Sequence, residues 1–228
     1  MPVTSKLYDP DDYRRPAFAE MRRYFESWWY ILAQEKVKFS YSHRNRAWEY
    51  ATVITSVPFA DRRVLDLGTS GSLAPIYLAR RLGCEVVTFD MAWEAERRSL
   101  YGATGVADRV RVDVGNLLDE LPYPDSSFDV VTCWSVIEHL RDYCVPISEM
   151  KRVCRAGGHI GVTTDFAPQR PHGVKSGSTF DRERLDALIE AIGLPFVGES
   201  DYENVDLALP HNLAVDQQYT FASIVLQN

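Results

Sequence analysis

Apolar side chains recur every three or four positions in two stretches of the first sixty residues. The first stripe comprises Phe18, Met21, Phe25, Trp28 and Leu32, and the second comprises Ala47, Tyr50, Ala51, Ile54 and Val57, just before Pro58. This spacing places the apolar residues of each stretch on one face of a helix. The pattern predicts two amphipathic helices, and residues 1–60 are expected to form an N-terminal helical cap.

From Asp61 onward the pattern changes to short apolar runs that alternate with amphipathic stretches. The runs, each typical of a buried strand, are 63–68, 85–90, 109–114, 128–133 and 159–164. Helical stretches at 73–82, 92–101 and roughly 145–153 lie between them. Strands that alternate with helices predict a doubly wound, mostly parallel sheet. Residues 61–228 are therefore expected to form one α/β domain.

The end of the chain departs from this alternation. A helix over 185–192 is predicted to end at Gly193, where a glycine can close the last turn. Two strand-like segments follow, 196–200 and 219–226, with no helical pattern between them. Strands joined without a helix usually pair antiparallel. The prediction is a seven-stranded sheet with an antiparallel last strand.

The composition fits a chain with one hydrophobic core. The 228 residues have a mass of 26.0 kDa, 46% of them are hydrophobic, and the formal net charge is −7. This acidic balance disfavours nucleic acid as a partner, so a small-molecule substrate is expected. The sequence has no secretory h-region or apolar span, and its four cysteines form no Cys-x-x-Cys pair. We expect a cytoplasmic protein without a membrane anchor, and a homodimer is compatible with these features.

Two acidic residues flank a glycine-containing turn after the first strand of the α/β domain. The turn covers residues 68–72, Gly-Thr-Ser-Gly-Ser, and Asp66 precedes it by two positions. Asp90 ends the next strand, where a carboxylate can accept hydrogen bonds from both hydroxyls of a ribose. The turn alone fits a structural role equally well, and it lacks the Gly-x-Gly-x-x-Gly spacing of a dinucleotide site. Its position between two acids at adjacent strand ends favours a ligand site.

Five ordered sequence blocks resemble those of class I S-adenosylmethionine-dependent methyltransferases. The blocks are Val64–Gly68, Val86–Asp90, Leu121–Val131, Ser135–Leu140 and Glu149–Gly158. They fall within residues 63–165, in the order and spacing of that family. The resemblance implies a Rossmann-like fold, S-adenosylmethionine as the cofactor, and methyl transfer as the reaction.

The resemblance also implies which residues hold the cofactor. Asp66 and the turn would cradle the methionine end, Asp90 would bind the ribose, and Met91 would lie beside the adenine. The residues assigned to the cofactor are Asp66, Gly68, Thr69, Ser70, Gly71, Asp90, Met91, Asn116, Leu117, Cys133 and Trp134. Two features depart from the family pattern. Ser70 and Ser72 occupy usual glycine positions, and Asn116 stands where an aspartate often accepts from the adenine amino group.

Methylation of a hydroxyl or ammonium group requires the removal of a proton, for which histidine is the natural base. The candidate catalytic residues are His139 beyond the fourth strand, Asp165 at the end of the fifth, and His172 and His211 in later loops. Each also fits a structural interpretation, as a packed histidine, a capped strand end or a solvated loop residue. Together with Glu138 they could hold a metal, but they lack a fixed-spacing motif, so no metal is predicted.

The choice of acceptor is expected to depend on the N-terminal segment. Thirteen of the 27 aromatic residues fall within residues 1–60, outside the cofactor blocks. Some could wall a substrate pocket, and Arg44 and Arg46 beside them could meet an anionic group, although a solvated basic face fits these two arginines better. The stretches 164–166 and 173–180 are similar to methyltransferases of polysaccharide and natural-product pathways, which favours a sugar-like small metabolite methylated on oxygen or nitrogen.

Three other functions fit parts of the sequence. A tRNA or rRNA methyltransferase would use the basic part of the cap, although the chain as a whole is acidic. A nicotinamide-dependent dehydrogenase is disfavoured by the spacing of the glycine turn. A non-catalytic module that binds the cofactor would accommodate the two serines found at usual glycine positions.

Overall fold

The computed structural model describes residues 2–39, 46–168, 179–203 and 219–228. The elements in chain order are β1 (Val3–Leu7), η1 (Pro10–Arg14), α1 (Pro16–Gln34), α2 (Arg46–Ser56), β2 (Arg63–Leu67), α3 (Ala74–Leu82), β3 (Glu85–Asp90), α4 (Glu94–Ala103), β4 (Val110–Val114), β5 (Phe128–Trp134), η2 (Ile137–His139), α5 (Cys144–Val153), β6 (Cys154–Phe166), α6 (Arg182–Ile192), β7 (Glu199–Asp201) and β8 (Thr220–Gln227). The helix end predicted at Gly193 is confirmed, and the helix predicted over 73–82 ends at Gly83; both glycines adopt the left-handed conformation that closes a helix.

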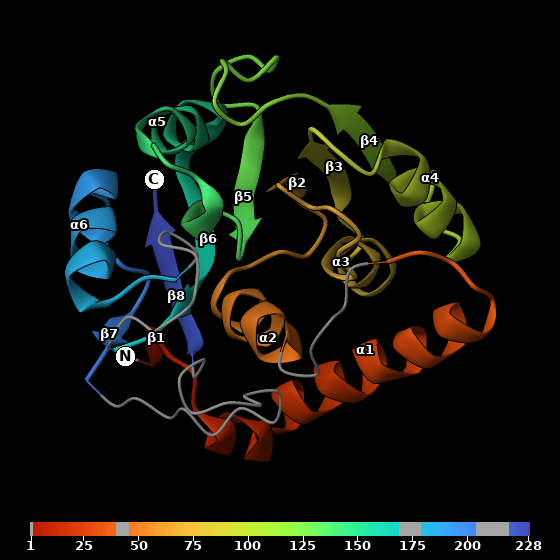
Figure 1. The fold of residues 1–228 in the computed structure, drawn as a ribbon, viewed down its shortest axis with the longest axis horizontal. Coiled ribbons are helices and arrows are strands. Elements are labelled where there is room, and N and C mark those ends of the chain that lie inside the picture. The colour runs from red at the N-terminus through yellow and green to blue at the C-terminus, as the bar shows by residue number, and fades with distance from the viewer. Residues whose placement is uncertain (1, 40–45, 169–178, 204–218) are drawn as a thin grey trace.

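One sheet connects all the strands, in the order β4-β3-β2-β5-β6-β8-β1-β7 (Figure 1). The five neighbouring strands β4, β3, β2, β5 and β6 are parallel to one another, whereas β8 is antiparallel to β6. Buried residues of α1 to α4 form one apolar cluster with the sheet, and those of α5 and α6 form another. The prediction of a doubly wound, mostly parallel α/β fold is confirmed.

The sheet has eight strands, not the predicted seven, because residues 3–7 form an extra strand. β1 lies between β8 and β7, antiparallel to the former and parallel to the latter. The expected antiparallel pairing of the last two strands is therefore wrong, apart from a single bridge between Phe196 and Leu226. Residues 1–60 contribute a strand of the sheet as well as the helices expected there.

The polar composition of β1, Val-Thr-Ser-Lys-Leu, concealed it from a search for apolar runs. Its place is fixed by contacts with residues more than two hundred positions away in sequence. Ser5 Oγ accepts a hydrogen bond of 2.8 Å from Val225 N and donates one of 3.3 Å to Val225 O. Pairing over such a separation depends on the finished sheet, so local periodicity does not predict it.

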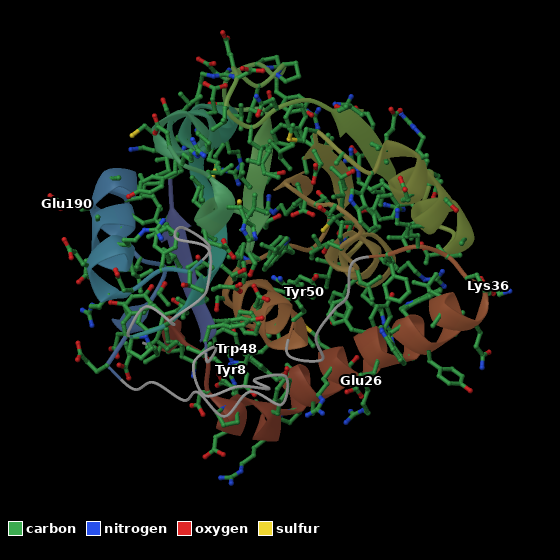
Figure 2. The ribbon with its side chains drawn as sticks, viewed as in Figure 1. Tyr8, Glu26, Lys36, Trp48, Tyr50 and Glu190 are labelled. Atoms are coloured by element: carbon green, nitrogen blue, oxygen red, sulfur yellow. The ribbon has the colours of Figure 1, made fainter. Side chains whose placement is uncertain are left out.

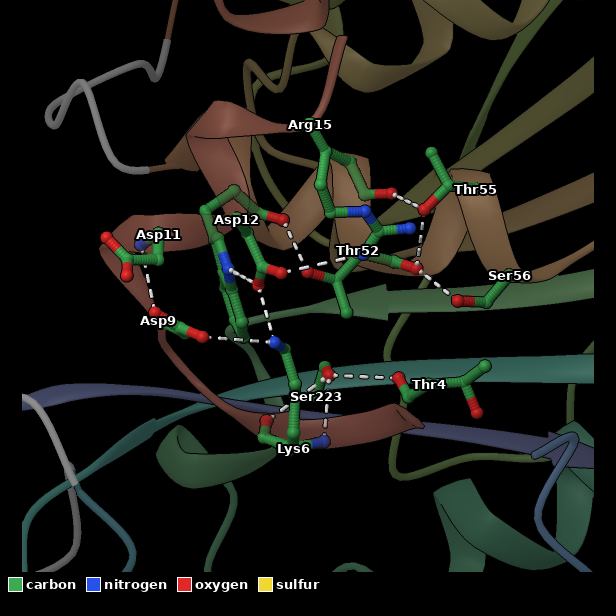
Figure 3. Close-up of polar contacts among 12 residues, drawn as sticks. Thr4, Lys6, Asp9, Asp11, Asp12, Arg15, Thr52, Thr55, Ser56 and Ser223 are labelled. Carbon is green, nitrogen blue, oxygen red and sulfur yellow. Dashed lines mark hydrogen bonds and ion pairs between the residues drawn. The ribbon is translucent and has the colours of Figure 1, made fainter. Parts of the chain in front are cut away.

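A buried carboxylate connects β1 and η1 to α2. Asp12, in η1, is 5% exposed, and its Oδ2 accepts a hydrogen bond of 2.9 Å from Trp48 Nε1. Lys6 Nζ of β1 lies 2.8 Å from the same oxygen (Figure 3). A buried carboxylate is stable only with such partners. Strand β1, the 3-10 helix η1 and helix α2 are thus held together. This fixes helix α2, which carries part of the site described next.

Candidate active site

A cavity of about 420 Å³ opens beside the carboxyl ends of the central parallel strands. This edge of an open α/β sheet is where such folds bind ligands. Nine residues assigned from the sequence line it: Gly68, Thr69, Ser70, Asp90, Met91, Asn116, Leu117, Trp134 and His139. The six other lining residues were not among the individually assigned cofactor or catalytic residues, although Ser72 belongs to the predicted turn and Arg46 was named for an anionic group: Arg46, Tyr50, Ser72, Ser135, Val136 and Leu140. The cavity therefore brings the predicted cofactor blocks together with α2.

The turn after β2 is held by contacts on two sides. Gly68 has φ of +67°, and a Cβ there would lie 2.5 Å from Val136 Cγ2, so only glycine fits. Ser70 donates its N–H to Asp90 Oδ2 at 2.8 Å. Ser72 Oγ lies 2.9 Å from the Tyr50 hydroxyl and accepts 3.2 Å from Ala74 N. The serine at this usual glycine position thus takes part in holding the start of α3 and its neighbour α2.

Asp90 is the acidic group of the cavity wall, and it lies at the end of β3. Its Oδ1 accepts a hydrogen bond of 2.9 Å from Ala92 N, while its Oδ2 accepts from Ser70 N at 2.8 Å and from Ser70 Oγ at 3.3 Å. A carboxylate can accept about four hydrogen bonds, so capacity remains for a ligand. Beside it Met91 is 72% exposed, an unusual setting for an apolar side chain at a cavity rim. This wall presents an acceptor and an apolar surface next to each other.

Three of the residues assigned to the cofactor lie outside the cavity lining. Gly71 and Cys133 are buried, as is Asp66, which is 0% exposed. Thr132 Oγ1 donates to Asp66 Oδ1 at 2.7 Å, and Asp66 Oδ2 has no partner among the described residues. Burial raises the pKa of Asp66 to about 7, although the hydrogen bond from Thr132 opposes this rise. Asp66 therefore supports the turn from below the cavity.

His139 stands at the end of η2 and is the one described histidine of the cavity lining. The residue is exposed, but partial desolvation of its ring and, secondarily, the charge of Arg46 lower its pKa below the usual 6.5. The imidazole is then neutral at pH 7 and can accept a proton. The other two candidate histidines, His172 and His211, fall outside the described residues.

Asp165 lies at the end of β6 and is not among the residues that line the cavity. Its backbone N–H donates to Glu138 Oε1 at 3.1 Å. Glu138 Oε2 and Asp165 Oδ1 are both buried without a hydrogen-bond partner in the described part of the chain. Burial raises the pKa of Asp165 to about 7 and raises the pKa of Glu138 well above its ordinary value. Two carboxyl groups thus lie near Arg46 in a poorly solvated region.

Glu49, on α2, was missed by the sequence analysis and organises this side of the cavity. Its side chain is 0% exposed, and its Oε2 accepts hydrogen bonds of 2.5 Å from Ser135 Oγ and from Thr163 Oγ1. Its Oε1 accepts 3.1 Å from Arg46 Nη1. Burial opposes the charge of Arg46, but Glu49 and the two carboxyl groups nearby raise its pKa above its ordinary value. Arg46 is therefore a fixed cation in the cavity wall.

The signal for these two residues was present in the sequence as a charged pair three positions apart. Such a pair on an amphipathic helix usually lies on the solvated face. In α2, however, all residues from Ala47 to Ile54 are buried, so the side of the helix that carries Glu49 also faces the protein interior. Figure 2 shows Tyr50 projecting from the same helix toward the strand ends. Its ring packs edge-on against Trp134, with ring centroids 5.2 Å apart.

Comparison with known proteins agrees with this geometry. A family model described as "Methyltransferase domain" matches residues 65–162, which contain β3 to β5 and most of β2 and β6. Residues 65–162 are thus similar to a methyltransferase domain. The cofactor of this domain type is S-adenosylmethionine. The sequence resemblance to this family is thus confirmed.

Curated relatives of the methyltransferase domain act on different small metabolites. The domain is 32% identical over 131 residues to a glycine/sarcosine/dimethylglycine N-methyltransferase of Actinopolyspora halophila, covering 56% of this chain and 23% of that protein. It is 35% identical over 116 residues to a ubiquinone biosynthesis O-methyltransferase of Xanthomonas euvesicatoria, covering 49% and 46%. The chain thus spans half or less of the length of these relatives.

The fold is similar to that of a solved geranyl diphosphate C-methyltransferase from Streptomyces coelicolor. The TM-score is 0.64 with 15% sequence identity, over 81% of this chain and 79% of the other. That structure contains Mg2+, geranyl diphosphate and S-adenosylhomocysteine. Likeness at this level of identity concerns the fold and not the acceptor.

The described residues fit S-adenosylmethionine better than a metal ion. The volume of the cavity lies within the range of small-molecule sites, roughly 300–1,000 Å³. The turn at Gly68 has no room for a Cβ, and Asp90 offers acceptors beside exposed Met91. Among the described residues, no group of three or more His, Cys, Asp or Glu side chains could hold a metal. In the same part of the chain, no helix has the length and apolarity needed to cross a membrane.

Proposed function

We propose that the protein transfers the methyl group of S-adenosylmethionine to an oxygen or nitrogen of a small metabolite. The observation that carries this proposal is the composition of the cavity wall. Asp90, Met91 and Asn116 line one part of it, and His139 and Arg46 line another. The first part suits the adenosine of the cofactor, and the second offers a neutral base and a cation. The matched relatives, which methylate small metabolites, support the same reaction class.

The adenosine of the cofactor would be held at the ends of β3 and β4. Asp90 would accept hydrogen bonds from the ribose hydroxyls, because a strand-end carboxylate is suited to that diol. Met91 and Leu117 would cover the faces of the adenine, and burial of Met91 would remove its exposed apolar surface from water. Asn116 would accept from the adenine amino group through its side-chain oxygen.

The amino-acid end of the cofactor would lie along the turn at residues 68–72. Arg46 is the cation among the cavity-lining residues, and Glu49 fixes one of its nitrogens, which leaves further N–H groups for a ligand. We infer that Arg46 binds the carboxylate of this amino-acid end. A guanidinium suits a carboxylate because the two groups can form parallel hydrogen bonds.

The chemistry of the chain itself is positioning and proton removal. When bound, the cofactor supplies an activated methyl group, so the protein must align the acceptor and take up its proton. His139 would take up that proton, because its lowered pKa keeps the imidazole neutral. Asp165, together with Glu138, would influence this site through Arg46 rather than by contact with the acceptor. His172 and His211 remain candidates for acceptor contact.

The acceptor would be selected by the N-terminal segment, residues 1–60, acting as a cap on the domain of residues 61–228. α2 already contributes Arg46 and Tyr50 to the cavity, next to residues of the cofactor blocks. A hydroxylated, sugar-like or natural-product acceptor fits the polar groups there.

Three of the four cysteines are buried free thiols, which supports a reducing, cytoplasmic setting.

The test is transfer of radiolabel from S-[methyl-3H]adenosylmethionine to a panel of hydroxylated and amine-containing metabolites. Label is expected in at least one metabolite, and tRNA and rRNA are included as competing acceptors. Transfer to RNA alone would replace the small-metabolite proposal with the nucleic-acid alternative. Tight cofactor binding without any transfer would support a non-catalytic module instead. Failure of the folded protein to bind the cofactor would overturn the proposal as a whole.

A further inference from the structure

Arg97 of α4 is a fully buried arginine that the proposed reaction does not use directly. Its side chain is 0% exposed. Its Nη1 donates to Thr88 O at 3.1 Å and to Thr88 Oγ1 at 3.2 Å. Its Nη2 donates to Asp90 O and to Asp113 O, both at 3.1 Å. One guanidinium therefore joins two neighbouring parallel strands, β3 and β4, near their carboxyl ends.

The acceptors of Arg97 are unusual for a buried cation. Burying a charge is costly unless it is paired and hydrogen-bonded, and such arginines usually bind carboxylates. The hydrogen bonds of Arg97 in the described residues go to carbonyl and hydroxyl oxygens, and Asp66 is a more distant opposite charge. A neutral side chain of similar size would fill the same space without this cost. The charge and the forked shape of the guanidinium therefore call for a reason other than packing.

The two strand ends that Arg97 joins carry two residues of the proposed adenosine site. Asp90 O accepts from both Arg97 Nη2 and Gly115 N, the latter at 3.3 Å. Gly115 packs so closely on Phe89 that a Cβ would lie 2.2 Å from the ring. Asn116 follows directly and lines the cavity, as Asp90 does. The strand ends that carry these two lining residues are thus joined by the Arg97 side chain as well as by the strand pairing.

We propose that Arg97 is a positioning residue for the cofactor, because it fixes the spacing of the strand ends that present Asp90 and Asn116 to the adenosine. This inference rests on the proposed function. Its effect is expected on affinity for the adenosine part and not on the chemical step. A planar guanidinium can reach two carbonyl oxygens on different strands at once, whereas a lysine ammonium on its flexible stem cannot hold the same fork.

The test compares Arg97→Lys with the wild type by calorimetric titration of S-adenosylhomocysteine and of 5′-methylthioadenosine, which lacks the amino-acid end. We expect the dissociation constants of both ligands to rise about tenfold in Arg97→Lys, the equivalent of about one hydrogen bond. The KM for S-adenosylmethionine should rise similarly, while kcat at saturating cofactor should stay near that of the wild type. Arg98→Lys is the matched control, because Arg98 is the exposed neighbour that pairs with Glu94.

A purely structural role would give a different result. A lower melting temperature with unchanged dissociation constants for the folded Arg97→Lys protein would overturn the inference. If that variant does not fold, Thr88→Val is the substitute, because it removes the hydroxyl acceptor of Arg97. The dissociation constants of both ligands are expected to rise about twofold in Thr88→Val. Unchanged affinity in Thr88→Val would then count against the inference. Absence of binding by the wild type would instead refute the proposed function.

Discussion

Glu49 and Ser135 are joined by a hydrogen bond of 2.5 Å, from Ser135 Oγ to Glu49 Oε2. The bond connects α2, in the N-terminal segment, with the residue that follows β5 in the cofactor-binding half of the chain. Thr163 Oγ1 of β6 donates to the same oxygen at 2.5 Å, and Arg46 donates to the other. A single buried carboxylate therefore aligns the helix that lines the cavity with two strands of the sheet.

The substitution Glu49→Gln should lower both stability and activity. The amide keeps the shape but loses the charge, and its NH2 group must face either two hydroxyls or the guanidinium of Arg46. A hydrogen bond to a charged group contributes about 1.5–3 kcal/mol, so we expect the free energy of unfolding to fall by about that amount. Urea unfolding measures the change, with Glu26→Gln on the surface of α1 as the control. An unchanged unfolding midpoint would contradict the role of Glu49.

Arg46→Met should weaken the binding of S-adenosylhomocysteine but leave the binding of 5′-methylthioadenosine unchanged. The first ligand carries the carboxylate assigned to Arg46, and the second lacks it. Loss of a charged hydrogen bond predicts a dissociation constant about ten- to a hundredfold higher for S-adenosylhomocysteine. Isothermal titration of both ligands checks this, with Arg22→Met of α1 as the control. Equal weakening of both ligands would show general damage, and no weakening would leave Arg46 for the acceptor.

His139→Gln should lower kcat by about a hundredfold, the contribution typical of a general base. In the wild type, kcat/KM should fall as the pH drops through the lowered pKa of His139, below about 6.5, because protonation removes the base. This acidic limb should be missing from the profile of the variant. The control is His159→Gln, because His159 is a half-buried histidine within β6. A variant with the wild-type rate and profile would place the base elsewhere.

The fold was largely predictable because its central elements follow local rules. β2, β3 and β5 are short, mostly apolar runs buried on both faces, and helices such as α3 end at a glycine. The turn around Gly68 and the strand-end Asp90 were recognisable as a ligand site for the same reason. Local rules say nothing about pairing partners far apart in sequence. Thus β1 and its insertion between β8 and β7 were not predicted.

The site was predictable where side chains follow strands and unpredictable where a helix meets them. Asp90 and His139 were assigned from their positions at or after strand ends and Asn116 from the family resemblance, and all three line the cavity. Glu49 was missed, and Arg46 was named only as a contact for an anionic group, because a charged pair on a helix ordinarily faces water. Only the packing of α2 against Ser135 and Thr163 shows that this pair lies inside.

Asp165→Asn should stabilise the protein, and more so at high pH. Burial raises the pKa of Asp165 to about 7 in the folded state, against about 3.9 in an unfolded chain. Between these values the folded state binds more protons, so wild-type stability falls as the pH rises from about 4 to 7. Asparagine does not ionise, so the melting temperature should exceed that of the wild type by several degrees at pH 8.

The gain from Asp165→Asn should largely disappear at pH 5, where the aspartate is already protonated. Thermal unfolding at both pH values measures this difference, and Asp186→Asn on the exposed face of α6 is the control. The same gain at pH 5 and pH 8, or destabilisation at both, would contradict the assignment of a buried, protonated Asp165.

The central claim is that the cavity beside Gly68 and Asp90 binds S-adenosylmethionine. Its most direct test is calorimetric titration of S-adenosylhomocysteine into the wild type and into Asp90→Ala, with Glu85→Ala at the exposed opposite end of β3 as the control. We predict one binding site per chain in the wild type and in the control, and at least tenfold weaker binding in Asp90→Ala. The absence of binding to the folded wild type, or equal affinity in Asp90→Ala, would contradict the claim.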